Sequence, residues 1–140
     1  MKILLPVDGS DYTKRMLSYI AAHDELLGAG HEYIALTAIV PIPGHAARFL
    51  DQGTLDDYYA EQAETVLKSV KAFAEQQHWK FRAAHRRGRP AEAIADFAAQ
   101  EKVDLIVMGT HGHSSLGNMV LGSVATGVLA RCKVPVLLIR

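Results

Sequence analysis

Two short segments of this chain combine glycine with polar side chains in a way that suits ligand binding. The aspartate loop is Asp8-Gly9-Ser10, and the glycine loop (residues 109–122) opens with Gly-Thr-His-Gly-His-Ser-Ser and leads into Ser123. Glycine lets the backbone approach a ligand closely and turn successive amide hydrogens toward an anion, and the start of a following helix adds its dipole. Polyphosphate is the ligand class that this chemistry favours.

The side chains in these loops indicate binding rather than metal or covalent chemistry. A carboxylate repels phosphate unless a cation or a hydroxyl lies between them, so we expect Asp8 to accept from ribose hydroxyls or to contact magnesium carried by a nucleotide. His111 and His113 have no assignable further ligands, and no protein metal site is predicted. Ser123 lacks an assignable base and acid partner, which favours a phosphate-binding or helix-capping hydroxyl.

The hydrophobic pattern predicts the strands that must position these loops. Short apolar runs alternate with longer segments of helical period, which is typical of an α/β fold with a parallel sheet buried on both faces. The expected strands are residues 3–7, 33–40, 80–85, 103–108 and 134–139. We predict one domain, residues 1–140, with an open five-stranded sheet in the order 3-2-1-4-5 and helices on both faces. The strand order reverses between the first and fourth strands, where the loops after Val7 and Met108 should meet.

Four helices are expected between the strands. Their predicted starts are Ser10 or Asp11, Asp56, Pro90 and Asn118. The first should end near Gly28 and the last at Arg131, with Gly127 allowing close helix packing. The segment from Pro41 to Leu55 holds two prolines and two glycines. It is too irregular for a simple connector, so we expect a lid or a partner loop.

The composition excludes several classes of partner and location. Fifteen Lys and Arg balance fifteen Asp and Glu, so no overall field favours nucleic acid or an anionic membrane, and neither partner is expected. The basic run from Arg82 to Arg89 is predicted to be a solvated strand end balanced by acidic neighbours. Cys132 is the only cysteine, which indicates a reducing compartment. No apolar run suits a signal peptide or a membrane span, and the expected location is the cytoplasm.

The order of the motifs resembles the universal stress protein family along essentially the whole chain. Gly109-x-x-Gly112, nine residues and then Gly122-Ser123 match the ATP-binding signature of that family. Further similar segments are Lys2 to Ser10, Gly88-x-Pro90, Asp104 to Gly109 and Val134 to Leu137. The resemblance implies an ATP-binding regulatory module of the stress response that binds ATP together with magnesium. It implies no enzymatic activity beyond slow ATP hydrolysis or autophosphorylation.

The resemblance also implies roles for individual residues. Asp8 would meet the ribose, Ala38 and Ile39 the adenine, and the signature glycines with Ser123 the phosphates. The full expected set is Pro6, Val7, Asp8, Ala38, Ile39, Met108, Gly109, Gly112, His113, Gly122, Ser123 and Val124. Family members form homodimers through the last strand, which implies antiparallel pairing of the segment from Val134 to Ile139. His113 stands where the family commonly carries arginine, which would weaken phosphate binding at neutral pH.

Two alternatives remain open from the sequence. The chain could be a dimeric interaction module that has lost nucleotide binding and acts through the Pro41 to Leu55 segment. It could also be an enzyme, because Thr110-x-Gly112-His113 superficially resembles the (His/Thr)-x-Gly-His motif of nucleotidylyltransferases. That motif follows the first strand in its own family and the fourth strand here. A P-loop ATPase is excluded because the chain contains no Gly-Lys pair.

Overall fold

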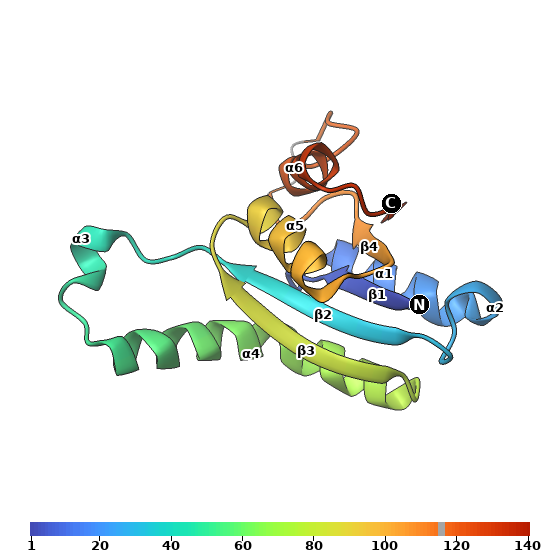
Figure 1. Cartoon of the computed structure of the whole chain (residues 1–140), viewed down its shortest axis with the longest axis horizontal. Helices are drawn as coiled ribbons and strands as arrows, with labels where there is room; N and C mark the ends of the chain where they lie inside the picture. The colour runs from blue at the N-terminus through green and yellow to red at the C-terminus, as the bar shows by residue number, and fades with distance from the viewer. Residues whose placement is uncertain (115–116) are drawn as a thin grey trace.

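Five parallel strands form one sheet in the order β3-β2-β1-β4-β5 (Figure 1). The structure, a computed structural model, describes residues 1–114 and 117–140, so Ser115 of the glycine loop lies outside the described residues. The strands are β1 (Lys2–Pro6), β2 (Glu32–Ile39), β3 (Lys80–Arg87), β4 (Leu105–Gly109) and β5 (Val136–Ile139). The predicted α/β class and the predicted strand order 3-2-1-4-5 are confirmed.

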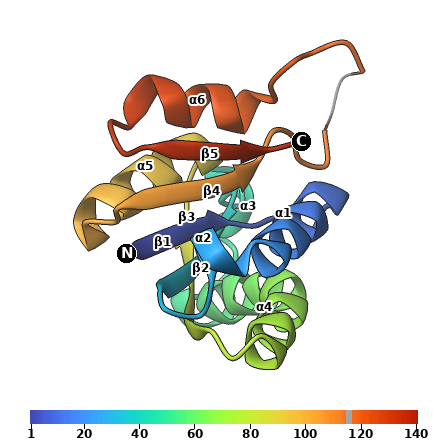
Figure 2. The same cartoon turned by 90° about the vertical axis from the view of Figure 1, so that its right-hand side faces the viewer.

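Helices cover both faces of the sheet, as Figure 2 shows. The helices are α1 (Asp11–Ala22), α2 (Asp24–Leu27), α3 (Gly44–Ala47), α4 (Gln52–Gln76), α5 (Pro90–Glu101) and α6 (Ser123–Arg131). The apolar faces of α1 and α4 pack against one side of the sheet, and those of α5 and α6 pack against the other. Side chains on successive strand positions point to opposite faces, so each central strand contributes to both cores.

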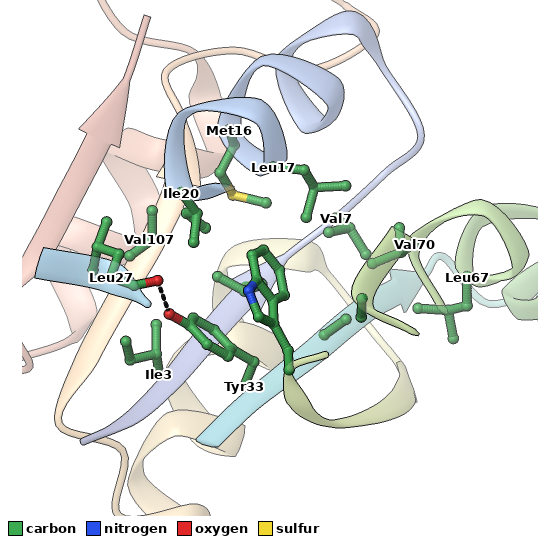
Figure 3. Close-up of a cluster of buried hydrophobic side chains, with 14 of the residues drawn as sticks. Ile3, Val7, Met16, Leu17, Ile20, Leu27, Tyr33, Leu67, Val70 and Val107 are labelled. Carbon is green, nitrogen blue, oxygen red and sulfur yellow. Dashed lines mark hydrogen bonds between the residues drawn. The ribbon is translucent and has the colours of Figure 1, made fainter. Parts of the chain in front are cut away.

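The core under α1 and α4 is centred on aromatic side chains (Figure 3). Tyr33 is fully buried and stacks on Trp79 with ring centroids 4.5 Å apart. Its hydroxyl donates to the carbonyl oxygens of Leu27 and Gly28, which satisfies the polar atom inside an apolar environment. Burial, together with the charge of Asp24, raises the pKa of Tyr33 to about 12, so this phenol remains protonated.

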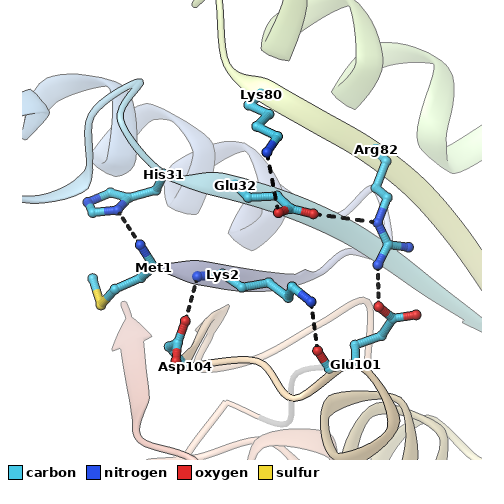
Figure 4. A network of polar contacts seen from close by, with 8 residues as sticks. All are labelled: Met1, Lys2, His31, Glu32, Lys80, Arg82, Glu101 and Asp104. Carbon is cyan, nitrogen blue, oxygen red and sulfur yellow. Dashed lines mark hydrogen bonds and ion pairs between the residues drawn. The ribbon is translucent and has the colours of Figure 1, made fainter.

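Polar contacts join the amino ends of the strands, opposite the ends that carry the two loops (Figure 4). The backbone amide of Lys2 donates to Asp104 at 2.7 Å, and its ammonium group donates to the carbonyl oxygen of Glu101 at 2.9 Å. Arg82 pairs with Glu101 and with Glu32. The expected balance of the basic run by acidic neighbours is therefore found at Arg82.

Several predicted helix ends differ from the observed ones, and α1 ends at Ala22 rather than near Gly28, followed by the separate helix α2. The second long helix begins at Gln52 rather than Asp56, since the Asp51 carboxylate accepts from the amide of Thr54 at 2.7 Å. The predicted irregular segment therefore includes α3 and the first turn of α4. Residue 118 lies before α6, which begins at Ser123. Ser10 is the N-cap residue of α1, but its side chain makes no capping hydrogen bond.

Gly127 allows α6 to approach α5, as the sequence predicts. A Cβ atom at Gly127 would lie 2.5 Å from the Cβ of Ala91. Replacing Gly127 with alanine is expected to separate the two helices and to lower the free energy of unfolding by about 1–3 kcal/mol, as overpacking usually does. Chemical denaturation measures this loss. Adding Ala91→Gly should recover much of it, and a double variant no more stable than Gly127→Ala would contradict direct contact as the cause.

Candidate functional site

A cavity of about 220 Å³ lies where the carboxyl ends of β1 and β4 meet the first turns of α5 and α6. This is the point at which the strand order reverses, where open parallel sheets bind ligands. The cavity is lined by Pro6, Val7, Asp8, Thr13, Leu36, Ala38, Pro90, Ile94, Met108, Gly109, Thr110, His111, Gly112, His113, Ser114, Gly122, Ser123, Val124 and Ala125.

The aspartate loop and the glycine loop are in direct contact at this cavity. The imidazole of His113 donates from Nε2 to the carbonyl oxygen of Asp8 at 2.7 Å. Gly112 is packed so closely against Asp8 that a Cβ atom there would lie 2.4 Å from the carboxylate oxygen Oδ2. The predicted meeting of the loops after Val7 and Met108 is therefore observed, and a side chain at position 112 would displace the carboxylate of Asp8.

The two carboxylate oxygens of Asp8 have different surroundings. Oδ1 accepts from the amide of Ser10 at 2.9 Å and from the hydroxyl of Thr13 at 3.0 Å. No hydrogen bond to Oδ2 occurs within the described part of the chain, and Gly112 lies next to this oxygen. Burial alone would raise the pKa of Asp8, but the hydrogen bonds from Ser10 and Thr13 outweigh it and lower the pKa below 3.8. The carboxylate is therefore an ionised acceptor with one oxygen available to a ligand.

The lowered pKa of Asp8 predicts a stability change in acid. Because the carboxylate binds protons less readily in the folded chain than in the unfolded one, its stabilising contribution is present above the unfolded pKa of about 3.9. The contribution is lost as the pH falls through the lower folded value. Denaturation of the chain and of Asp8→Asn between pH 7 and pH 2.5 should show a stability difference that shrinks below pH 4. A constant difference would contradict this account.

Both ring nitrogens of His111 are used within the protein. Its Nε2 donates to the carbonyl oxygen of Met119 at 2.8 Å, so Nδ1 accepts from the hydroxyl of Thr110 at 3.0 Å. The ring also lies 5.2 Å from that of Tyr12 on α1. The side chain of His111 therefore connects the beginning of the glycine loop to Met119 near its end.

The remaining signature glycines permit close backbone contacts. A Cβ atom at Gly109 would lie 2.7 Å from the Cβ of Tyr12, and one at Gly122 would lie 3.1 Å from the carbonyl oxygen of Thr110. Gly122 is the N-cap of α6, and no described side chain caps that helix. The amides of its first turn, beginning at Ser123 and Val124, therefore lack intrahelical partners while these residues line the cavity.

All but one of the residues expected to bind the nucleotide line this cavity. The exception is Ile39, whose side chain packs with the core under α1 and α4. The reason is the alternation of side chains along β2, which directs Ala38 and Ile39 to opposite faces. Sequence reasoning missed Thr13, Leu36, Pro90, Ile94, Thr110, His111, Ser114 and Ala125. Pro90 carried a usable signal, because it begins the helix that follows β3.

A sequence model of the universal stress protein family matches residues 1–140. The chain belongs to this family. The universal stress protein in the QAH/OAS sulfhydrylase 3′ region of Thermus aquaticus is 37% identical over 138 residues, covering 99% of this chain and 97% of that protein. Universal stress protein MJ0531 of Methanocaldococcus jannaschii is 32% identical over 142 residues, covering 99% and 81%.

The solved structure of hypothetical protein MJ0577 has the same fold as this universal stress protein. The TM-score is 0.81 at 29% sequence identity, and the match covers 99% of this chain and 94% of the other. Among the residues that the structure describes, no helix is both long and apolar enough to cross a membrane. The same residues contain no group of three or more His, Cys, Asp or Glu side chains arranged to hold a metal ion.

Proposed function

We propose that this universal stress protein is a regulatory module that binds an adenine nucleotide, ATP with magnesium, in the cavity between β1 and β4. The observation that carries the proposal is the combination of three groups in one cavity: a deep apolar end, a carboxylate with one available oxygen, and the uncapped start of α6. These groups suit a base, a ribose and a phosphate respectively.

Burial along the cavity supports one orientation of the nucleotide. The apolar lining residues Leu36, Ile94 and Met108 are at most 4% exposed and suit the flat apolar faces of adenine. His113 and Ser123 are exposed, so the polar end of the cavity is its mouth. The base would enter first, and the phosphates would remain near the amides of α6.

Asp8 lies between these ends and suits the ribose. Its Oδ2 is an ionised acceptor, and hydrogen bonds from hydroxyls to charged acceptors are among the stronger ones in proteins. Asp8 is also the only acidic residue that lines the described cavity. One carboxylate is sufficient for magnesium held mainly by the phosphates of ATP, because Mg²⁺ retains waters and needs few protein ligands.

Solved structures with the same fold support the choice of an adenine nucleotide. A universal stress protein family protein of Arabidopsis thaliana was solved with AMP bound, with a TM-score of 0.71 and 15% identity. The universal stress protein of Archaeoglobus fulgidus was solved in complex with dAMP, with a TM-score of 0.70 and 21% identity. A third family member was solved in complex with cAMP.

Calorimetric titration of the nucleotide-stripped chain with ATP and magnesium tests the proposal, together with mass spectrometry of any nucleotide that copurifies. We expect saturable binding, and Asp8→Ala should weaken it by more than about tenfold, since a hydrogen bond to a charged group contributes roughly 1.5–3 kcal/mol. Asp11→Ala is the matched control, because Asp11 is exposed and does not line the cavity. Absence of any nucleotide binding would refute the proposal.

We further propose that the chain forms a homodimer through β5. This strand is at the edge of the sheet, and pairing it antiparallel with a second copy would satisfy its outer backbone groups. Sedimentation equilibrium should give a dimer mass. Amide exchange of the segment from Val134 to Ile139 should slow as the protein concentration rises, and concentration-independent exchange in this segment would count against the pairing.

An interaction-only module is the second candidate, and one feature favours it. The segment that carries α3 projects from the body of the molecule (Figure 1). Phe49 in this segment is 78% exposed, and Leu50 is also exposed. Exposed apolar side chains together on a projecting segment suit contact with another protein. A functional partner that binds equally well with and without nucleotide would favour this second candidate.

A further inference from the structure

We propose that the cavity recognises adenosine with one phosphate and does not distinguish ATP from AMP, an inference that rests on the proposed nucleotide binding. The observations concern the charges and donors at the mouth of the cavity, where the second and third phosphates of ATP would lie. Selection for the longer phosphate chain requires groups that interact with those phosphates more strongly than water does.

No lysine or arginine lines the cavity in the described residues. Ser115 and Leu116, the two residues outside the description, carry no charge. The one fixed charge in the lining is the carboxylate of Asp8, which repels phosphate. Each additional phosphate therefore brings more negative charge to a site in which the described protein residues supply no permanent cation, so only magnesium carried with the nucleotide offsets that charge.

The two histidines in the lining are not permanent cations, because the charge of an imidazole depends on pH. A neutral imidazole has a single N–H donor. His113 uses this donor on the carbonyl oxygen of Asp8, and His111 uses its own on the carbonyl oxygen of Met119. Neither neutral ring has a second donor to offer to a phosphate oxygen.

The small volume of the cavity leads to the same conclusion. Its volume of about 220 Å³ is below the ~300–1,000 Å³ of pockets that enclose most of a drug-sized ligand. With the base at the buried apolar end, the first turn of α6 is placed to bind one phosphate through the amides of Ser123 and Val124. Phosphates beyond the first would extend past the exposed side chain of His113 into solvent.

The consequence is a module whose occupancy follows the total concentration of adenine nucleotides rather than the ratio of ATP to AMP.

Dissociation constants of the full chain for adenosine, AMP, ADP and ATP, each measured with magnesium and with EDTA, test this inference. We expect AMP, ADP and ATP to agree within about tenfold. ATP binding more than about tenfold tighter than AMP, in either condition, would overturn the inference. Failure of all four ligands would instead refute nucleotide binding itself, and this inference with it.

Substitution of His113 provides the second arm of the test. His113→Arg should raise the preference for ATP over AMP by roughly ten- to a hundredfold, the usual worth of a charged hydrogen bond. Asn118→Arg adds the same charge to the glycine loop outside the cavity lining and should leave the preference unchanged. His113→Gln keeps a neutral hydrogen-bond donor and should also leave the preference for ATP over AMP unchanged. An unchanged preference in a folded His113→Arg variant would contradict the proposed cause.

Discussion

Replacing Gly122 with valine is expected to abolish nucleotide binding while the fold persists, with the affinity for ATP falling by more than about a hundredfold. The amide of Gly122 donates to the carbonyl oxygen of Thr110 at 2.7 Å. A Cβ atom would lie 3.1 Å from that same oxygen and 3.2 Å from the Cα of His111, and valine adds two methyl groups to it. The clash is with backbone atoms, and relieving it shifts the start of α6 relative to Thr110 and His111, which misplaces the amides that we propose bind the phosphate.

Gly117→Val is the matched control for this variant, because in the described part of the chain no heavy atom beyond its sequence neighbours lies within 4 Å of a Cβ atom built at Gly117. Both substitutions change a glycine of the same loop to the same β-branched residue. Calorimetry with ATP and magnesium compares their affinities, and circular dichroism establishes that α6 and the sheet remain folded. Unchanged affinity in folded Gly122→Val would remove the glycine loop from the phosphate site.

The strands were predictable because each one depends on a pattern that extends over several residues. Ile3, Leu4 and Leu5 form a continuous apolar run and are all fully buried, as a central parallel strand requires. Helix ends were less predictable because a single local contact can decide where a helix begins, and residue type alone does not show whether that contact forms. Asp51 starts α4 through one hydrogen bond to Thr54, whereas Ser10 occupies an N-cap position without making such a bond.

The glycine positions of the candidate site were predicted from the sequence, whereas most of its apolar end was not. Glycine at positions 109, 112 and 122 is visible in the sequence, and each one stands where a Cβ atom would lie closer than about 3.2 Å to a neighbour. The apolar end of the cavity was largely missed. Leu36 and Ile94 are ordinary core residues by type, and only the packing of α5 beside β2 shows that they line a cavity. The tautomer of His111 was likewise not predictable, because it is set by the hydrogen bond to the carbonyl oxygen of Met119. Only the folded path of the glycine loop brings these two residues together.

Replacing Phe97 with alanine is expected to lower the free energy of unfolding by about 3–5 kcal/mol, the usual cost of removing a large buried aromatic ring. Phe97 is 1% exposed and belongs to the core under α5 and α6, and the guanidinium of Arg86 lies 4.7 Å from its ring. Chemical denaturation measures the loss. Saturating ATP should recover part of it, because a ligand that binds only the folded chain stabilises that state.

Phe49→Ala is the matched control, since the same side chain is removed from a position that is 78% exposed. This variant should change the stability by no more than about 0.5 kcal/mol. Phe97 also anchors the helix whose first turns carry Pro90 and Ile94 to the cavity. Folded Phe97→Ala should therefore bind ATP more weakly than Phe49→Ala does. Equal losses of stability in Phe97→Ala and Phe49→Ala would show that burial of Phe97 in this core does not stabilise the fold. Equal affinities of the two variants for ATP would show that α5 does not shape the site.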